Sequence, residues 1–247
     1  MTASPGNTAP KKLLIINPNS TEDITVGIAD ALNPRCPPGC QLEYFTGPAH
    51  APTAIRDYVT GIQTATACFD ELVNTSAFER YDGFLVCCFS DHPLQHMIRE
   101  HLGPASTKYC VGMFEAGISQ ALMFNKQFGI VSTGEGFKPL LKKGVSAFLG
   151  ASASDRFVGS AMSGIQVEEL RNPNLRAQVE TKIKEASAKV AIMGADTIIM
   201  GCGGMAGMEL LVLQGVREAG LPDVKVIDAA LAGLVFLAGV VSTGSPV

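Results

Sequence analysis

Short runs of apolar residues alternate along the chain with longer stretches whose apolar residues recur every three or four positions. The short runs have the length of buried strands, and the longer stretches have the spacing of one helix face. The predicted strands are residues 12–16, 41–45, 82–86, 108–113, 127–131, 156–159, 196–200 and 224–227. The predicted helices are residues 57–78, 91–102, 172–193 and 205–219, one capped by Ser20 or Thr21, one that ends near residue 146, and one that opens at Asp228. This alternation indicates an α/β fold, with parallel sheets covered by helices on both faces.

An apolar strand that ends in a cysteine occurs twice in the chain, 114 positions apart, at Cys88 and Cys202. The neighbouring Cys87 corresponds to Gly201 in this repeat. The repeat predicts two similar lobes, each with a parallel four-stranded sheet. Parallel sheets bind ligands at the carboxyl ends of their strands, which is where both cysteines are expected. We therefore predict an active site between the lobes.

Composition excludes several classes of partner. The 247 residues are 47% hydrophobic and 17% charged, with a net charge of −4 and no basic patch, so nucleic acid is not an expected partner. The longest apolar run, residues 229–241, is shorter than the roughly 20 residues that span a bilayer. It predicts a buried C-terminal helix and no membrane segment. Residues 1–10 are small and polar, which favours a disordered tail over a signal peptide.

The seven cysteines favour reduced thiols and a cytoplasmic protein, because a chain of this length needs no disulfide framework. Cys36 and Cys40 lie in a turn without two further ligands nearby, so no metal site is expected there. His92 and His96 are spaced to share one helix face, but no third ligand accompanies them. We interpret both as surface residues or as support for neighbouring groups.

Two thiols in matched positions suit proton transfer at a stereocentre. Inversion without a cofactor needs one acid/base group on each face of a planar carbanion. Thiols at Cys88 and Cys202 are expected to have lowered pKa values, since each precedes a loop or helix start with free N–H groups. The alternative is that both are small buried hydrophobic residues. Stabilisation of the carbanion is expected from Asn17, Ser20, Ser90, Thr133 and the N–H groups of Phe89 and Gly203, with Gly203 and Gly204 allowing close backbone approach.

The residues around these cysteines resemble those of the aspartate/glutamate/hydantoin racemase superfamily, and within it the hydantoin and allantoin racemase branch. The matching segments are Ile16-Asn-Pro-Asn-Ser-Thr21, Cys88-Phe-Ser-Asp91, Gly201-Cys-Gly-Gly-Met205, Glu115-Ala116 and Phe128-Gly-Ile-Val131. The resemblance covers about residues 12 to 241. Hydantoin racemases more commonly continue the second segment with proline and glycine, whereas this chain has His92-Pro93, which resembles the fungal members and leaves the substrate open.

The resemblance implies two pseudo-symmetric lobes and racemisation by two cysteines without metal or pyridoxal phosphate. It assigns Cys88 and Cys202 as the bases, and Asn17, Thr133 and the neighbours of each cysteine as ligand contacts. It also implies that the C-terminal helix returns to the first lobe, which gives residues 11–112 plus 226–247 as lobe 1 and residues 113–225 as lobe 2. The related arylmalonate decarboxylases keep only the second cysteine, so the presence of both favours racemisation.

The predicted function is a cofactor-independent racemase of a 5-substituted hydantoin, with allantoin a member of that class. The partner is a small-molecule substrate, and the chain is a candidate homo-oligomer. Alternatives are a sensor that binds a ureide or amino acid in the same cleft, an amino-acid racemase or decarboxylase of the superfamily, and a hydrolase that pairs Cys88 with His92 or His96. A dinucleotide site at residues 201–206 fits poorly, because no acidic ribose ligand follows at the required spacing.

Overall fold

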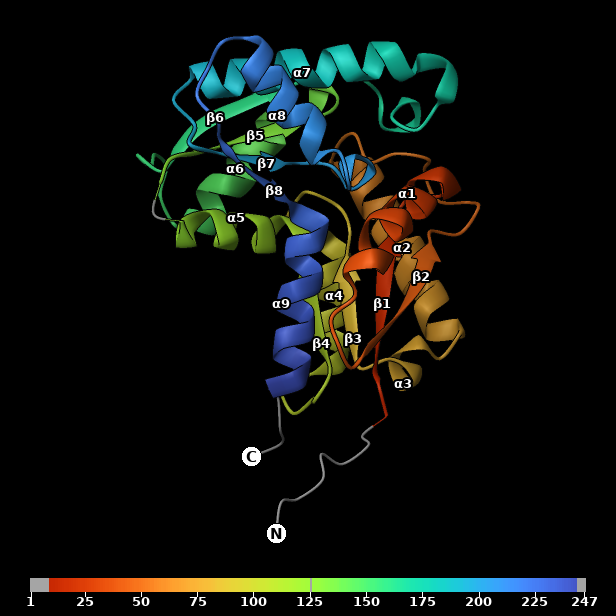
Figure 1. Cartoon of the computed structure of the whole chain (residues 1–247). Coiled ribbons are helices and arrows are strands. Elements are labelled where there is room, and N and C mark those ends of the chain that lie inside the picture. The colour runs from red at the N-terminus through yellow and green to blue at the C-terminus, as the bar shows by residue number, and fades with distance from the viewer. Residues whose placement is uncertain (1–8, 125, 244–247) are drawn as a thin grey trace.

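The computed structural model describes residues 9–124 and 126–243 (Figure 1). Most of the predicted N-terminal tail therefore lies outside the described residues. The chain forms two parallel four-stranded sheets, as predicted from the alternation and the repeat. We refer to the part built on the N-terminal sheet as the first lobe, and to the part built on the other sheet as the second lobe.

The first sheet has the strand order β2-β1-β3-β4, with all neighbours parallel. Its strands are β1 (Lys11–Asn17), β2 (Cys40–Thr46), β3 (Gly83–Val86) and β4 (Tyr109–Gly112). The second sheet repeats this topology in the order β6-β5-β7-β8. Its strands are β5 (Phe128–Ser132), β6 (Phe157–Met162), β7 (Thr197–Met200) and β8 (Lys225–Asp228).

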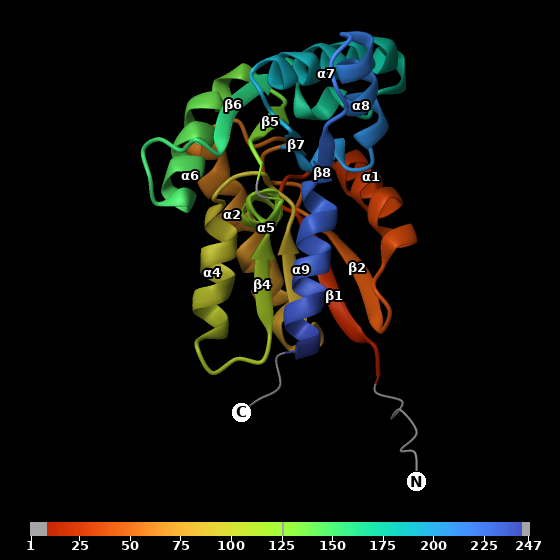
Figure 2. The ribbon, with the colours of Figure 1, turned by 60° about the vertical axis from the view of Figure 1, so that its left-hand side comes forward.

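Helices cover both faces of each sheet (Figures 1 and 2). The α-helices are α1 (Glu22–Leu32), α2 (Tyr58–Asn74), α3 (Ala77–Arg80), α4 (Pro93–Leu102), α5 (Met113–Met123), α6 (Lys138–Leu149), α7 (Arg176–Ile192), α8 (Glu209–Glu218) and α9 (Ala229–Thr243). Five short 3-10 helices lie in the described loops: η1 (Asn33–Arg35), η2 (Glu135–Phe137), η3 (Val167–Glu169), η4 (Pro173–Leu175) and η5 (Gly203–Met205).

Alternate residues of β1 show how a strand buried on both faces serves two cores. Leu14 and Ile16 pack in a cluster with residues of α2, α3 and α4. Leu13 and Ile15 belong to a second cluster with residues of α1 and α9. This is the two-residue period of a strand with helices on both sides, and it explains why the segment reads as one continuous apolar run.

One hydrophobic cluster continues from the first lobe into the second. It contains Leu85 of β3, Ile199 of β7, and buried residues of α5 and α9. Helix α5 contacts β4 of the first sheet and both β7 and β8 of the second, and it packs along α9. Helix α9 lies against β3 and β4, so the C-terminal helix returns to the first lobe. The exact lobe boundaries at residues 113 and 226 stay predictions, since α5 packs on both sheets.

Several predicted helices begin or end differently in the structure. The helix predicted over 57–78 divides into α2 and α3 at Ser76, whose left-handed φ of 51° breaks the helix. Thr21 precedes α1 as predicted, but its hydroxyl donates to the Thr53 carbonyl instead of capping the helix. The helix predicted over 91–102 begins at Pro93 in α4, and His92 caps it.

The apolar segment near the C-terminus forms α9, a buried helix as predicted. Eight of its residues are buried, among them Ala229, Leu234 and Leu237. Within residues 9–124 and 126–243, no helix has the length and apolarity needed to cross a membrane. The hydrophobicity of this segment is accounted for by its contacts with both sheets and with α5.

Replacing Leu237 with Ala is expected to lower the free energy of unfolding by about 2–5 kcal/mol. The side chain is fully buried, and its Cδ1 lies only 2.9 Å from where a Cβ on Gly83 would be, so it fills the space between α9 and β3. Urea unfolding followed by circular dichroism measures the loss. Val235 of the same helix is 56% exposed, and Val235→Ala is the control, with an expected change below about 0.5 kcal/mol. Equal losses for the two variants would contradict this packing.

Candidate active site

The two cysteines of the repeat follow equivalent strands and leave them in the same way. The N–H of Cys87 donates to the Ile16 carbonyl of β1 at 2.8 Å, and the N–H of Gly201 donates to the Val131 carbonyl of β5 at 2.7 Å. Each of these residues therefore continues the sheet by one hydrogen bond. The next residue, Cys88 or Cys202, leaves the sheet and is partly exposed, whereas Cys87 is buried.

The backbones of the two lobes come into close contact beside these thiols. A Cβ on Gly203 would lie 2.7 Å from the Cys87 carbonyl oxygen, closer than any side chain permits. A Cβ on Gly204 would lie 2.6 Å from a methyl group of Leu170 and 2.9 Å from one of Ile24. Glycine at position 203 is thus required by the close approach of the lobes, and at position 204 it leaves room for the side chains of Leu170 of the same lobe and Ile24 of the other.

Both thiols open on one cavity of about 50 Å³ between the lobes. This volume holds only a few water molecules. The first lobe contributes Asn19, Ile24, Ile55, Cys87, Cys88 and Phe89 to its lining, and the second contributes Ser132, Thr133, Phe137, Val167, Gly201, Cys202, Gly203 and Gly204. Apart from the thiols, none of these described residues has an ionisable side chain. The cavity is therefore narrow, mostly apolar and free of fixed charge.

Cys202 has several groups that favour its thiolate. Burial raises the pKa of the Cys202 thiol above its ordinary value. The nearby Gly204 N–H, Thr133 hydroxyl and Met205 N–H act the other way and lower this pKa, as does the positive charge of Arg171. The net direction is upward, so the desolvation of the thiolate outweighs these donors.

Cys88 has weaker support for a negative charge. Burial raises the pKa of the Cys88 thiol to about 12, and a charge on Cys202 contributes to that rise. Its opposing contact is the Ser90 hydroxyl, 3.2 Å from the sulfur. Helix α4 begins five residues later, at Pro93, so its N–H groups do not reach this sulfur. The expectation of lowered pKa values for both thiols is therefore wrong.

Two predicted contact residues do not line the cavity. The Asn17 amide nitrogen donates to Asn19 Oδ1, to the Thr21 carbonyl and to Thr25 Oγ1, so it holds the loop after β1 in shape. The Ser20 hydroxyl donates to the Ala51 carbonyl at 2.8 Å. Asn19, which sequence reasoning missed, lies in the cavity wall. Its Oδ1 accepts from Asn17 and Thr21, and its amide nitrogen donates to no other described residue.

The other predicted contacts lie where the two lobes meet. Phe89, Thr133, Gly203 and Gly204 line the cavity itself. Ser90 lies behind Cys88, in a separate groove between α2, α4 and α6 that also contains Asp91, His92 and Lys143. Its hydroxyl contacts the cysteine sulfur, but it lies outside the wall of the cavity. The structure therefore brings most of the predicted set together around the two thiols.

The histidines of α4 have structural roles. His92 is buried, its Nδ1 accepts the Leu94 N–H at 3.3 Å, and its Nε2 lies 3.2 Å from the Thr64 hydroxyl. Burial lowers its pKa to about 4. Of the two predicted roles, His92 therefore has that of support for neighbouring groups, whereas His96 is an exposed residue that pairs with Asp91 at 2.6 Å. In the described ranges no three His, Cys, Asp or Glu side chains converge as metal ligands.

The sequence profile of the Asp/Glu/Hydantoin racemase family matches residues 13–237, which include both sheets and both site cysteines. The chain belongs to the Asp/Glu/hydantoin racemase family. This confirms the resemblance that the cysteine segments indicated.

Relatives within this family span nearly the whole chain. An uncharacterized protein of Schizosaccharomyces pombe is 35% identical and covers 93% of this chain and 92% of that protein. A hydantoin racemase of Paenarthrobacter aurescens is 26% identical and covers 89% of this chain and 87% of that protein. The crystal structure of allantoin racemase from Pseudomonas fluorescens has the same fold, with a TM-score of 0.76 and 22% identity over 95% of this chain and 92% of that chain.

Alkylation by iodoacetamide is expected to be slow at Cys88 and Cys202 near neutral pH and to accelerate as the pH rises. Only the thiolate reacts, and a raised pKa means that less thiolate is present at a given pH. Cys202 is expected to react at lower pH than Cys88, since its donors oppose the effect of burial. Mass spectrometry of digested protein, labelled between about pH 7 and 10, reports each site. Faster labelling of Cys88 than of Cys202 would contradict this order.

Proposed function

We propose that this member of the racemase family inverts the C5 stereocentre of a 5-substituted hydantoin, with allantoin among the candidates, by two-base proton transfer between Cys88 and Cys202. The observation that supports this most strongly is the arrangement of the thiols. They are partly exposed cysteines at equivalent strand ends of two related lobes, and both open on one cavity between the lobes.

In the proposed reaction, the Cys202 thiolate removes the proton from C5, and the bonding electron pair passes to the adjacent ring carbonyl. The Cys88 thiol then donates its proton to the opposite face of the planar carbon. The other enantiomer reacts with the roles of the thiols exchanged. A sulfur about 3–3.5 Å from C5 on each face implies roughly 7 Å between the two sulfurs, with the substrate carbon between them.

The cavity offers donors for the oxygen that becomes negative. The Asn19 amide nitrogen makes no hydrogen bond to another described residue, while its oxygen is fixed by Asn17 and Thr21. An amide held in this way can donate to a developing oxyanion without further ordering. The Thr133 hydroxyl lies beside Cys202 in the same wall. These groups are fixed before the substrate binds, which is the condition for stabilising the transition state.

The absence of fixed charge among the described lining residues favours a neutral substrate. An amino acid or a dicarboxylate has carboxylates that need cationic partners or many donors when they leave water. The lining described here is built from apolar, amide and hydroxyl groups. A hydantoin ring is neutral, and the carbonyl bonded to C5 acidifies the C5–H. This supports the hydantoin class over acidic amino acids for this chain.

The hydrolase alternative finds little support. A cysteine hydrolase needs a histidine in hydrogen-bond reach of its nucleophile. Both ring nitrogens of His92 are used by Leu94 and Thr64, and its lowered pKa of about 4 keeps it neutral. His96 is paired with Asp91 on the exposed side of α4. A sensor that binds without turnover has the same geometry, so the test must measure chemistry.

Optical rotation of enantiopure 5-substituted hydantoins and of allantoin, measured in D2O with EDTA present, tests the proposal. We expect loss of rotation with deuterium uptake at C5, followed by mass spectrometry. Cys88→Ser and Cys202→Ser are each expected to lower the rate of inversion by about 10²–10⁴-fold, because each removes one acid/base group. Either variant is expected to retain slow deuterium exchange into one enantiomer, which assigns the face of the remaining thiol.

Cys36→Ser is the matched control, since Cys36 lies in the surface turn before β2 and not on the cavity. It is expected to racemise like the wild type. Constant rotation and mass across the substrate panel would sink the hydantoin proposal. Binding without exchange would identify a sensor, and a change in substrate mass beyond deuterium uptake would identify a hydrolase or a decarboxylase.

The value of kcat/KM is expected to rise about tenfold per pH unit between about pH 6 and 8. The reason is that the active form needs one thiolate, and burial raises the pKa of both thiols, so the thiolate fraction grows with pH in this range. Spontaneous racemisation is subtracted by using the Cys88→Ser, Cys202→Ser double variant as the blank. A maximum near pH 7, or a flat profile, would show that the thiolate forms more readily than burial allows.

A further inference from the structure

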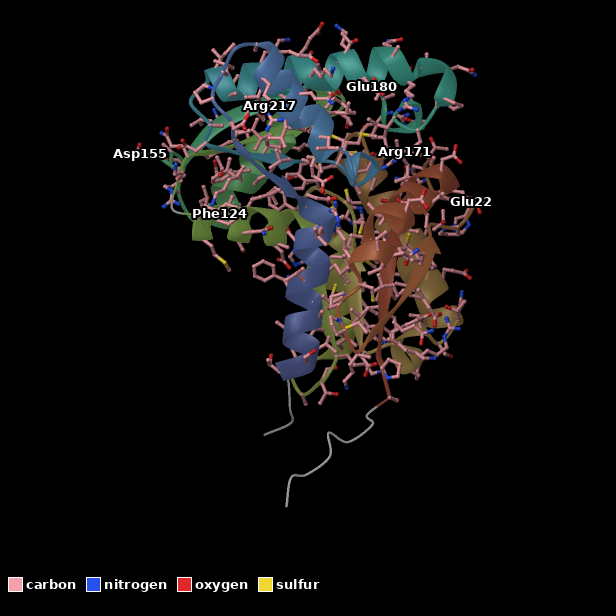
Figure 3. The ribbon with its side chains drawn as sticks, viewed as in Figure 1. Glu22, Phe124, Asp155, Arg171, Glu180 and Arg217 are labelled. Carbon is pink, nitrogen blue, oxygen red and sulfur yellow. The ribbon has the colours of Figure 1, made fainter. Side chains whose placement is uncertain are left out.

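Arg171 lies just behind the cavity, between the loop that follows Cys202 and helix α1 of the other lobe. Figure 3 shows its side chain at this junction of the lobes. Its Nε donates to the Gly204 carbonyl at 3.1 Å, and its Nη2 donates to the Ala206 carbonyl at 2.6 Å. A single guanidinium therefore binds two carbonyls of the loop that contains Gly203 and Gly204.

The first of these bonds supports the short helical turn η5, which directly follows Cys202. The Gly204 carbonyl and the Met205 N–H belong to the same peptide, and this N–H donates to the Cys202 carbonyl at 3.0 Å. The guanidinium, this peptide and the Cys202 carbonyl thus form one series of hydrogen bonds that fixes the turn, and the Gly204 N–H of the same turn favours the Cys202 thiolate. Hydrogen bonds linked in this way strengthen one another in a low-dielectric interior.

The second bond fixes the far end of the same loop. The Ala206 carbonyl shares its peptide with the Gly207 N–H, which donates to Asp228 Oδ2 at 3.0 Å. The other oxygen of Asp228 accepts the Ala230 N–H at the start of α9. Arg171 and Asp228 therefore hold opposite sides of one peptide. This anchors the loop to the helix that joins the two lobes.

Helix α1 is shaped to admit the guanidinium. A Cβ on Gly27 would lie 2.5 Å from Arg171 Nε, 2.6 Å from its Cζ and 2.9 Å from its Nη2. The guanidinium thus occupies the space of a side chain on α1. A glycine inside a helix costs about 1 kcal/mol relative to alanine, and here it makes room for this contact.

The first lobe has no equivalent device behind Cys88 within the part of the chain that the structure describes. Arg99, on α4, donates to the Cys110 carbonyl and to the Glu115 carboxylate at the start of α5. Neither contact involves the loop of Cys88, whose sulfur has the Ser90 hydroxyl as its hydrogen-bond partner. The two thiols of the repeat are therefore equivalent in position and different in surroundings.

We propose that Arg171 is a positioning residue that makes Cys202 the more readily ionised thiol of the pair, by binding the carbonyls of Gly204 and Ala206 so that the turn after Cys202 keeps its shape and the Gly204 N–H stays beside the sulfur. It does not touch the substrate cavity and acts through the loop. The inference rests on the proposed function only in treating the two thiols as a working pair.

The charges around this arrangement are few. Arg171 faces Asp30 of α1, Asp228 and the Cys202 thiol. Burial lowers the pKa of Arg171, and these three groups oppose that effect, so the guanidinium stays positive throughout the range of the test. Cys202 faces Arg171 and, across the cavity, Cys88.

The test is site-resolved alkylation with iodoacetamide as a function of pH, read as the ratio of Cys202 to Cys88 labelling in the same molecules. This ratio cancels any difference in how often the cavity opens. Arg171→Gln is expected to lower the ratio about tenfold at pH 8, which is one unit of pKa at Cys202 alone. Arg176→Gln is the matched control, since Arg176 is exposed and pairs with Glu180, and it is expected to leave the ratio unchanged.

Gly27→Ala tests the same inference without removing the charge. The added methyl group must displace the guanidinium from the loop, whereas alanine itself favours the helix. The labelling ratio is expected to fall as in Arg171→Gln, with far-UV circular dichroism unchanged. This variant keeps the inference testable if Arg171→Gln fails to fold. Arg171→Lys keeps the positive charge but cannot donate to both carbonyls in the same geometry. Its expected labelling ratio lies between those of wild type and Arg171→Gln.

An unchanged ratio in both Arg171→Gln and Gly27→Ala would overturn the inference. A wild-type labelling ratio in Arg171→Lys would show that the two hydrogen bonds to the loop carbonyls are not needed, because the positive charge alone would then account for the ratio. Equal slowing at both cysteines would also overturn it, since that is the signature of general loosening. Labelling needs no turnover, so a chain that fails to racemise any hydantoin and still shows the expected ratios would contradict the proposed function and leave this inference standing.

Discussion

The close contact between Gly203 and the Cys87 carbonyl is the constraint on which the site depends. It brings the end of β3 in one lobe against the loop after β7 in the other, at a distance that excludes even a methyl group. Because Cys88 directly follows Cys87 and Cys202 directly precedes Gly203, this one contact sets how the two thiols face the same cavity. A larger residue at position 203 forces the lobes apart and separates the thiols.

The lobes are held together very differently on their two sides. On one side, α5 and α9 belong to a hydrophobic cluster that runs through both lobes without interruption. On the other side, Arg56 pairs with Glu168, and the Thr53 hydroxyl donates to the same carboxylate at 3.1 Å. Exposed ion pairs of this kind contribute at most about 1 kcal/mol.

The sequence was sufficient for the parts of the site that local patterns determine. The repeated strand that ends in a cysteine placed Cys88 and Cys202 at equivalent strand ends, and the paired glycines signalled a close backbone approach. Asn17 was predicted as the cavity residue, whereas Asn19 lines the cavity. Both lie in one motif, and only the geometry of the turn decides which amide faces the cavity. Arg171 was missed because its partners lie in a distant loop and in the first lobe, and no local spacing records such contacts. The pKa direction was wrong because burial, which outweighs the local donors, is a property of the assembled lobes.

Burial of the thiol pair has two opposite effects on proton transfer from carbon. It lowers the fraction of thiolate at neutral pH, and it makes the thiolate that does form a stronger base. The proposed hydantoin substrate, whose C5–H is acidified by the neighbouring ring carbonyl, needs little base strength, so for it the smaller thiolate fraction matters more than the gain in base strength. The groups around Cys202 reduce the loss of thiolate at this one of the two cysteines. Charge-stabilising groups on one side only also disfavour ionisation of both thiols together, and so favour the state with one thiolate and one thiol that the proposed transfer across a planar carbon requires.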